Sequence, residues 1–342
     1  MNNPQFLSLK DTNVLKGIAL LMLLFHHLFY VQKGLYDDIQ LTSTHALVQD
    51  IGIWCKICVA IFVFLSGYGL TIGAMKSNGM TNIKHFYWHR FTKLLMNYWF
   101  IWLVFVPISV FVFGRTFTDV YQTHIIPKLL LDFFGVINCM GWYGYNATWW
   151  FYTCIIVLYL CFPFLYRLQE KSPLLTMASI VCICLLPIPL FTSAKVYFAS
   201  FYMGMVVCRE QNNTSKNTPP HLLWWIVLAV FSVERFIVHD VLIFDAFLTL
   251  AIIMAYKTLR LPQFALTALG FLGKHSMNIF LFHTFIYYYW FREFIYASRN
   301  PLVIFLLLLA ICLVVSLCLE VLKRILHFNQ IVDRIDKLVS IK

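Results

Sequence analysis

NVLKGIALLMLLFHHLFY, residues 13–30, is an apolar stretch that carries one lysine and two histidines. Ionisable side chains within a membrane helix are costly, so they usually face a protein interior or a wet cavity and belong to a functional path. Lys16 and His27 share one helix face, since eleven residues at about 100° each bring them into line, about 16 Å apart along the axis. His26 lies roughly 80° to one side of that face. The stretch predicts a cation near one mouth of a channel and a titratable imidazole well inside it.

The composition of the whole chain predicts a membrane protein. Of its 342 residues, 61% are hydrophobic and 12% are charged, whereas a soluble domain carries about 25% charged residues. The net charge of +11 is spread over short basic clusters between apolar runs, which indicates loops that face anionic lipid and not nucleic acid. Most of the ten cysteines lie in apolar runs, where cysteine behaves as a small hydrophobic residue.

Spans of about 20 apolar residues predict an all-α, polytopic membrane helix bundle of about ten transmembrane helices, forming a single integral-membrane domain over residues 1–342. The stretch 124–139 carries Pro127, Lys128 and Asp132, and we expect a re-entrant or interfacial helix there. Most of the 26 basic residues fall on one side, which predicts cytoplasmic termini. We expect a multi-pass protein of a cell membrane, the bacterial cytoplasmic membrane. The predicted spans are 13–32, 48–75, 91–113, 147–167, 173–191, 195–208, 221–238, 241–257, 274–295 and 299–323.

Candidate residues for acid–base chemistry and for anion binding lie on the first and third spans. An imidazole exchanges protons near neutral pH, so His27 is a candidate general base, and His26 would orient it, share its proton or line the cavity. Lys16, Arg90 and Lys93 would hold phosphate groups at the inner side of one cavity. The alternatives are a snorkelling lysine, a histidine bonded to a neighbouring helix and ordinary basic residues of cytoplasmic loops.

An aromatic run, GWYGYNATWWFYT at 141–153, begins the fourth span on its predicted outer side. Trp142, Tyr145, Trp149 and Trp150 are candidates for a substrate-binding wall, because aromatic rings stack on sugar rings and acyl chains. The alternative is the general enrichment of Trp and Tyr at membrane interfaces. His275 and His283, in LGKHSMNIFLFHTF, are either packing groups or cavity groups.

Several motifs are absent from the sequence. It has no glycine-rich phosphate loop, no HExxH, no GxSxG and no carboxylate pair at catalytic spacing. Acidic residues are scarce in the spans, which argues against a cation-coupled transporter and against a metal site. Cys55 and Cys58 have the spacing of a redox motif, but no βαβ context supports that role.

Six segments in this order resemble the membrane acyltransferase family 3: LKGIALLMLLFHHLF, IFVFLSGYGL, HRFTKLLMNYW, TWWFYTCIIVLYLCFPFL, FYMGMVVCR and LGKHSMNIFLFHTFI. The resemblance runs from about residue 13 to 320. The family motif of a basic residue, ten residues and a histidine falls on Lys16 and His27, and the basic residue of the third span falls on Arg90. Many members carry a glutamate shortly after the TW of the fourth span, where this chain reads TWWFYTC.

The resemblance implies an O-acyltransferase that moves an acetyl or other short acyl group from cytoplasmic acyl-CoA to a hydroxyl of a surface or exported polysaccharide or of a glycolipid. We expect acetyl-CoA or another acyl-CoA as donor substrate, no permanently bound cofactor, contact with membrane lipid and no nucleic-acid partner. The acyl group could pass directly or through a relay, and the oligomeric state is open. The alternatives are an exporter of a glycan or lipid-linked sugar without acyl chemistry, and a structural membrane subunit.

Overall fold

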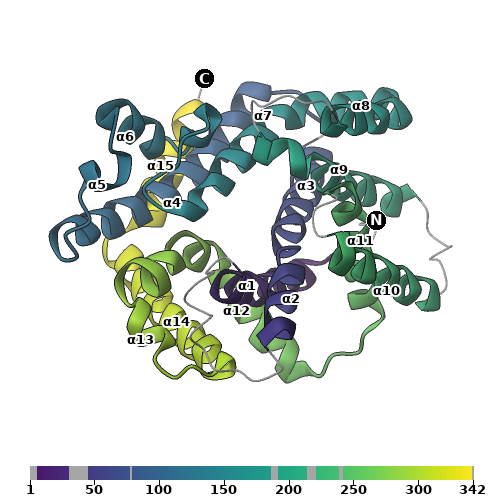
Figure 1. Ribbon diagram of the computed structural model, residues 1–342. Coiled ribbons are helices and arrows are strands. Elements are labelled where there is room, and N and C mark those ends of the chain that lie inside the picture. The colour runs from purple at the N-terminus through teal and green to yellow at the C-terminus, as the bar shows by residue number, and fades with distance from the viewer. Residues whose placement is uncertain are drawn as a thin grey trace.

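The computed structural model describes residues 6–30, 45–77, 79–185, 192–213, 221–238 and 242–340, and within these ranges it contains helices and no strand (Figure 1). The predicted all-α fold is confirmed. The ends of three predicted spans, at 31–32, 186–191 and 241, lie outside the described residues. The helices at the predicted spans are α1 (Leu9–Phe29), α2 (His45–Cys55), α3 (Cys58–Lys76), α4 (Ile83–Phe111), α7 (Trp150–Lys171), α8 (Pro173–Leu185), α9 (Thr192–Asn213), α10 (His221–Val238), α11 (Leu242–Thr258), α12 (Gln263–Thr284), α13 (Arg292–Tyr296) and α14 (Pro301–Ile325).

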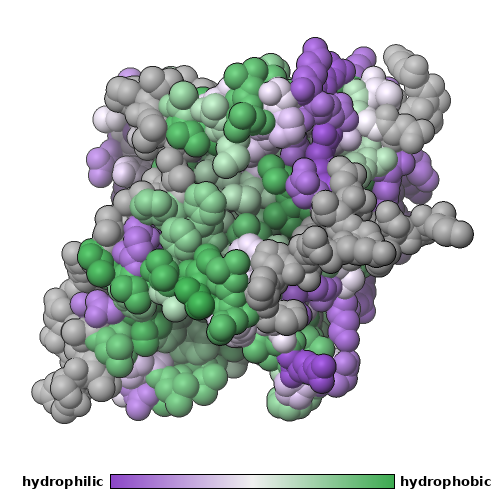
Figure 2. All heavy atoms as spheres, turned by 90° about the vertical axis from the view of Figure 1, so that its right-hand side faces the viewer, coloured by the Kyte–Doolittle hydropathy of each residue, from purple (hydrophilic) through white to green (hydrophobic). Residues whose placement is uncertain are grey.

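Five helical segments of the described chain are long and apolar enough to cross a membrane: Leu9–Phe29, Leu47–Lys76, Ile83–Phe111, Ala147–Lys171 and Pro301–Ile325. They support a membrane protein, whereas the number of ten spans and the cytoplasmic termini stay predictions. The exposed side of α10 also supports a membrane protein. Five of its exposed apolar residues recur every three or four positions and so share one helix face: Leu222, Ile226, Val230, Val233 and Ile237. Leu223, Trp225 and Phe236 beside them are exposed as well. On the face of the molecule drawn in Figure 2, hydrophobic side chains gather at the lower left and hydrophilic ones lie along the right-hand edge.

Two predicted spans differ from single straight helices. The second is divided by a turn at residues 56–57, between α2 and α3. In place of the predicted span 274–295, α12 begins at Gln263, directly after Pro262 in extended conformation. The helix continues as a π-helix over Phe285–Trp290, and α13 follows it. The residues that the earlier start adds, 263–271, are exposed or partly buried, and Leu272 is the first buried residue of the helix.

The stretch 124–139 contains α6 (Ile125–Phe133) and a short 3₁₀ helix, Ile137–Met140. Nine residues of α-helix extend about 13 Å, far less than the hydrocarbon core of about 30 Å. This segment does not form a full crossing. It lies beside α5 (Phe117–Tyr121), at the upper left of Figure 1.

Two pairs of helices, α1 with α12 and α3 with α9, pack backbone against backbone at glycines. A Cβ atom at Gly273 would lie 1.8 Å from the carbonyl oxygen of Asn13, and one at Gly204 would lie 2.1 Å from that of Phe64. Small residues at such positions allow the close helix approach that is common in membrane bundles. As a result α1, with Lys16 and His27, is held against α12 near the middle of the bundle (Figure 1).

The C-terminal helix α15 (Phe328–Ser340) lies against α4. Trp88 on α4 donates an indole hydrogen bond to the carbonyl oxygen of Ile335 at 3.0 Å. The His89 ring and the Asp336 carboxylate lie 2.6 Å apart. These contacts hold the helix beside the part of α4 that carries Arg90.

Candidate functional site

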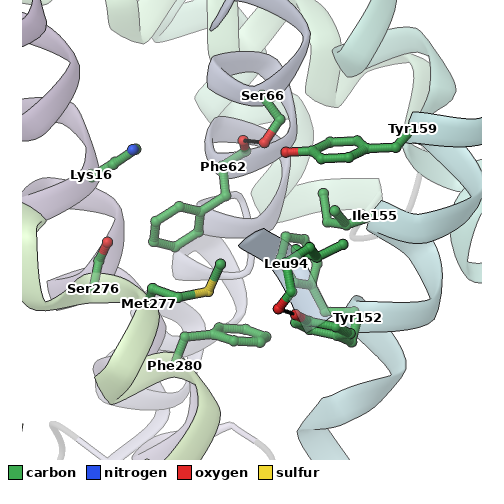
Figure 3. Close-up of a pocket in the computed structure, with 11 residues that line it drawn as sticks. Lys16, Phe62, Ser66, Leu94, Tyr152, Ile155, Tyr159, Ser276, Met277 and Phe280 are labelled. Carbon is green, nitrogen blue, oxygen red and sulfur yellow. Dashed lines mark hydrogen bonds between the residues drawn. The ribbon is translucent and has the colours of Figure 1, made fainter. Parts of the chain in front are cut away.

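Lys16 lines a cavity of about 160 Å³ between α1, α3, α4, α7 and α12, which we call the Lys16 cavity (Figure 3). Its side chain points toward Phe62 and Ser66 of α3. Burial is the only influence on its ammonium group that arises from the described residues, and no carboxylate there neutralises it. A cation held in this way is available to an anionic ligand. The cavity is lined by Lys16, Phe62, Ser66, Leu94, Phe151, Tyr152, Ile155, Tyr159, Ser276, Met277 and Phe280.

The lining of the Lys16 cavity changes from polar to apolar. The polar part combines Lys16 with the hydroxyl groups of Ser66 and Tyr159; in the upper half of Figure 3, Ser66 and Tyr159 lie close to each other and the Lys16 nitrogen points into the cavity from the left. At the other end, the rings of Phe151 and Phe280 pack with their centroids 4.8 Å apart. This gradient suits a ligand with a polar or charged end and an apolar end.

Arg90 lines a second cavity of about 270 Å³ at the end of α3 and the start of α4, which we call the Arg90 cavity. A Cβ atom at Gly73 would lie 2.8 Å from an Arg90 guanidinium nitrogen, so the glycine makes room for this side chain. Ser66, which lines the Lys16 cavity, and Leu70, which lines the Arg90 cavity, are about one helical turn apart on α3. The two cavities are therefore neighbours. Lys93 is exposed and lines neither of them, so the structure does not bring all three predicted phosphate ligands into one cavity.

The second half of α1 meets the end of α12 in a histidine cluster, formed by His26, His27 and His283 together with Tyr287. The ring centroids of His27 and His283 are 5.0 Å apart, and those of His26 and His27 are 5.2 Å apart. Tyr287 stacks on His283 at 5.9 Å. His283 and His26 are buried, whereas His27 is partly exposed. Among the described residues, no three His, Cys, Asp or Glu side chains are arranged to hold a metal ion.

The hydrogen bonds of the cluster constrain its tautomers. His26 Nδ1 lies 2.7 Å from the carbonyl oxygen of Gly52, which only accepts, so Nδ1 donates. His27 Nδ1 is buried and has no hydrogen-bond partner among the described residues. Buried imidazole nitrogens are usually hydrogen-bonded, so this unpaired atom needs an explanation.

His27 does not line the Lys16 cavity. Phe280 lies between this cavity and the histidine cluster, since it lines the cavity and its ring centroid is 6.3 Å from that of His283. Lys16 lies in the cavity and His27 in the adjacent histidine cluster, and Phe280 faces both.

The four aromatic residues predicted as a substrate wall are divided among different surroundings. Trp149 is buried and donates to the carbonyl oxygen of Leu281 at 2.9 Å. Tyr145 is buried and donates to that of Arg115. Trp142 stacks on His124, and Trp150 stacks on Tyr197. The structure therefore does not bring the four together on one surface.

A buried carboxylate in the stretch 114–146 was not singled out as a site residue by the sequence. Asp132 is fully buried and accepts hydrogen bonds from the hydroxyl groups of Tyr121, at 2.6 Å, and Tyr98, at 3.3 Å, and from the backbone N–H of Tyr145. Removal from water raises the pKa of Asp132 to about 6, although these donors act in the opposite direction. Its partners come from separate segments, and no sequence motif connects them.

A second polar network joins α12 to α14 and α4. The buried ammonium of Lys323 donates to Asn278 at 2.9 Å, to Asn97 at 3.1 Å and to Glu320 at 3.1 Å. Asn278 in turn donates to Glu320 at 2.8 Å. Because each of these groups has a partner, we interpret the network as a structural connection between helices.

Residues 9–321 match a family model described as an acyltransferase domain. The match covers most of the chain, so the protein belongs to acyltransferase family 3, and the resemblance seen in the sequence is confirmed. Comparisons with curated proteins and with solved structures gave no significant match. The family and the apolar helices together define a membrane acyltransferase.

Proposed function

We propose that this protein is an O-acyltransferase, which moves an acetyl or other short acyl group from acyl-CoA to a hydroxyl of a cell-surface or exported polysaccharide. The observation that carries this proposal is the placement of Lys16 and His27 on one helix of an acyltransferase domain, with Lys16 in a cavity and His27 in the adjacent histidine cluster.

The two neighbouring cavities suit a long donor with phosphates at one end. Arg90 and Lys16 would hold the phosphate groups of acyl-CoA, because both cations are free of carboxylate partners among the described residues. Lys93 is left out of this site because it is exposed. The pantetheine arm would follow the apolar part of the Lys16 cavity past Phe280. The separation of about 16 Å between Lys16 and His27 along α1 is comparable with that path.

His27 would act as the general base. It takes the proton of the acceptor hydroxyl while that oxygen attacks the carbonyl carbon of the thioester. The carbon–sulfur bond then breaks, and coenzyme A leaves as a thiolate that takes the proton from His27. The imidazole is neutral again at the end, so no charge stays in the membrane interior.

Purified protein in lipid nanodiscs, incubated with acetyl-CoA and with polysaccharide from a deletion strain, tests this function. We expect release of free thiol together with acetyl groups on the polysaccharide. His27→Ala should lower both by at least about 100-fold at unchanged protein abundance, since a general base contributes about 10²–10⁴-fold. An exporter without acyl chemistry would release no thiol, and acetylation by His27→Ala at the wild-type rate would remove His27 from the mechanism.

A further inference from the structure

The proton position on His283 can be deduced from its own helix. Its Nδ1 lies 3.0 Å from the carbonyl oxygen of Ile279 and 2.9 Å from that of Phe280. Carbonyl oxygens only accept hydrogen bonds, so Nδ1 must carry the proton and donate it. In the neutral ring, Nε2 then bears a lone pair and is an acceptor.

The acceptor atom of His283, Nε2, has no hydrogen-bond partner among the described residues. This atom is buried, and His27 Nδ1 is likewise buried and without a partner among the described residues. The two rings are neighbours, with centroids 5.0 Å apart and planes inclined by 51°. Buried polar atoms are nearly always paired in proteins, so two unpaired nitrogens on adjacent rings need an explanation.

Among the described residues, the groups that surround His27 include imidazoles and no carboxylate. The charges that act on it from the described residues are those of His283 and His26. His26 already donates its Nδ1 proton to Gly52, and Tyr287 has its ring centroid 6.5 Å away. Of these neighbours, His283 is the one with a buried ring nitrogen that has no partner among the described residues, so its Nε2 is the acceptor that we assign to His27.

The chain conformation beside His283 is unusual as well. The α-helical hydrogen bonding of α12 ends at Thr284 and gives way to the π-helix over Phe285–Trp290. Single π-helical turns within α-helices occur frequently at functional sites. Here the π-helix begins two residues after His283 and contains Tyr287, which stacks on the His283 ring.

We propose that His283 is a positioning residue for His27, an inference that depends on the proposed acyltransferase function. Its Nε2 accepts a hydrogen bond from one ring N–H of His27. The other ring nitrogen of His27 then keeps its lone pair and faces the acceptor hydroxyl. During transfer His27 gains the hydroxyl proton and returns it to the coenzyme A thiolate, while the proton on His283 Nδ1 stays in place.

A neutral hydrogen-bond acceptor suits the position next to His27. A carboxylate at the same place would introduce a charge into the interior of the bundle, which is expensive in a membrane. An imidazole whose Nδ1 proton is fixed by backbone carbonyls orients the partner ring without that charge. Helix α12 thus supplies both the scaffold and the acceptor.

Two substitutions of His283 distinguish a role in positioning His27 from a role in helix packing alone. In His283→Asn the amide can still donate to the Ile279 and Phe280 carbonyls, but the acceptor at Nε2 is lost. In His283→Gln an amide oxygen can reach the place of Nε2. We expect His283→Asn to lower kcat for acetyl transfer from acetyl-CoA by about 10- to 100-fold with little change in KM, and to alter the pH profile of kcat. His283→Gln should restore most of the rate.

The matched control is His275→Asn, which removes another buried histidine of α12, one whose Nδ1 contacts Ser316. It should keep the wild-type rate and pH profile. If His283→Asn keeps both as well, or if His283→Asn and His283→Gln lose activity and thermal stability to the same extent, the positioning role is overturned.

A measurement that needs no catalytic turnover distinguishes the positioning role of His283 from the proposed acyltransferase function. In ¹⁵N-histidine NMR of the wild-type protein, with resonances assigned through His→Asn variants, we expect His283 to show a protonated Nδ1 and a bare Nε2. A protonated Nε2 in neutral His283 would overturn the positioning role whether or not acyl transfer occurs. If the NMR result agrees and no acetyl transfer is found with wild-type protein, the proposed function fails and takes the role of His283 with it.

Discussion

The backbone of Gly17 on α1 touches that of Leu269 on α12, so that a Cβ atom at position 17 would lie 2.1 Å from the Leu269 carbonyl oxygen. Gly17 directly follows Lys16, and the contact therefore fixes the distance between the helix that carries the proposed cation and the helix that carries His283. The geometry of the site depends on this absence of a side chain.

Substitution of Gly17 by alanine should push α1 away from α12. We expect a loss of about 1–3 kcal/mol of stability, the range for overpacked interiors, together with lower acetyl transfer. Gly69→Ala on α3 is the matched control, because nothing lies within 4 Å of a Cβ atom there. The midpoint of thermal unfolding in detergent measures the difference. Equal midpoints for the two variants would show that the α1–α12 contact can relax.

Arg90 and Lys93, the two cations near the start of α4, should differ in their contribution to the binding of acetyl-CoA. Arg90→Gln removes a charge that lines a cavity, and we expect KM for acetyl-CoA to rise about 10-fold, the equivalent of one charge-assisted hydrogen bond of about 1.4 kcal/mol. Lys93→Gln should change KM by less than about twofold, since Lys93 is exposed. Initial rates of thiol release at varied acetyl-CoA give both values. A comparable rise in both variants would place Lys93 in the donor site.

Phe280 should influence the length of the acyl group that is accepted. Phe280→Ala would enlarge the passage between the Lys16 cavity and the histidine cluster, and we expect the rate with butyryl-CoA, relative to acetyl-CoA, to rise about 10-fold. Phe271→Ala is the control, because Phe271 lies on the same helix and does not line the cavity. An unchanged ratio of the two rates would exclude Phe280 from acyl selection.

Asp132 should make the stability depend on pH. Its pKa in the folded state, about 6, is above the ordinary value of 3.8, because burial disfavours the charged form. The stabilising contribution of the protonated group is therefore complete below about pH 4 and is lost as the pH rises through about 6. A shift of about two pKa units corresponds to a loss on the order of 2–3 kcal/mol.

Thermal unfolding of the wild type and of Asp132→Asn between pH 4 and pH 8 checks this dependence. The wild-type midpoint should fall between about pH 4 and pH 6 and then level off, and the midpoint of Asp132→Asn should fall less there, because the asparagine does not titrate. Parallel curves for the two proteins would assign the pH dependence to other groups.

Much of the fold could be predicted from composition and spacing. The apolar run of α1, and the face shared by Lys16 and His27, follow from local helix geometry. The length of the second apolar run did not reveal the turn at 56–57, since α2 and α3 are both apolar and the break between them carries no proline or glycine. The start of α12 was missed for a related reason, because Lys274 appeared to mark the beginning of a span.

The candidate site was predictable only in part. Sequence spacing placed Arg90 and Lys93 on one side of a helix, but a difference of three positions was enough to turn one toward the Arg90 cavity and the other toward solvent. The aromatic run around Trp149 looked like one surface, yet its members pack against different helices. Which neighbour each ring meets is decided by residues far away in the chain.

The sequence by itself determined an all-helical membrane acyltransferase with Lys16 and His27 aligned on one helix, because membrane compatibility and helix periodicity depend on residues close together in the chain. Only the tertiary structure decided that His283 is the neighbour of His27 and that Phe280 lies between the Lys16 cavity and the histidine cluster. Those relationships arise from the contact of α1 with α12, whose glycines meet backbone atoms distant in sequence.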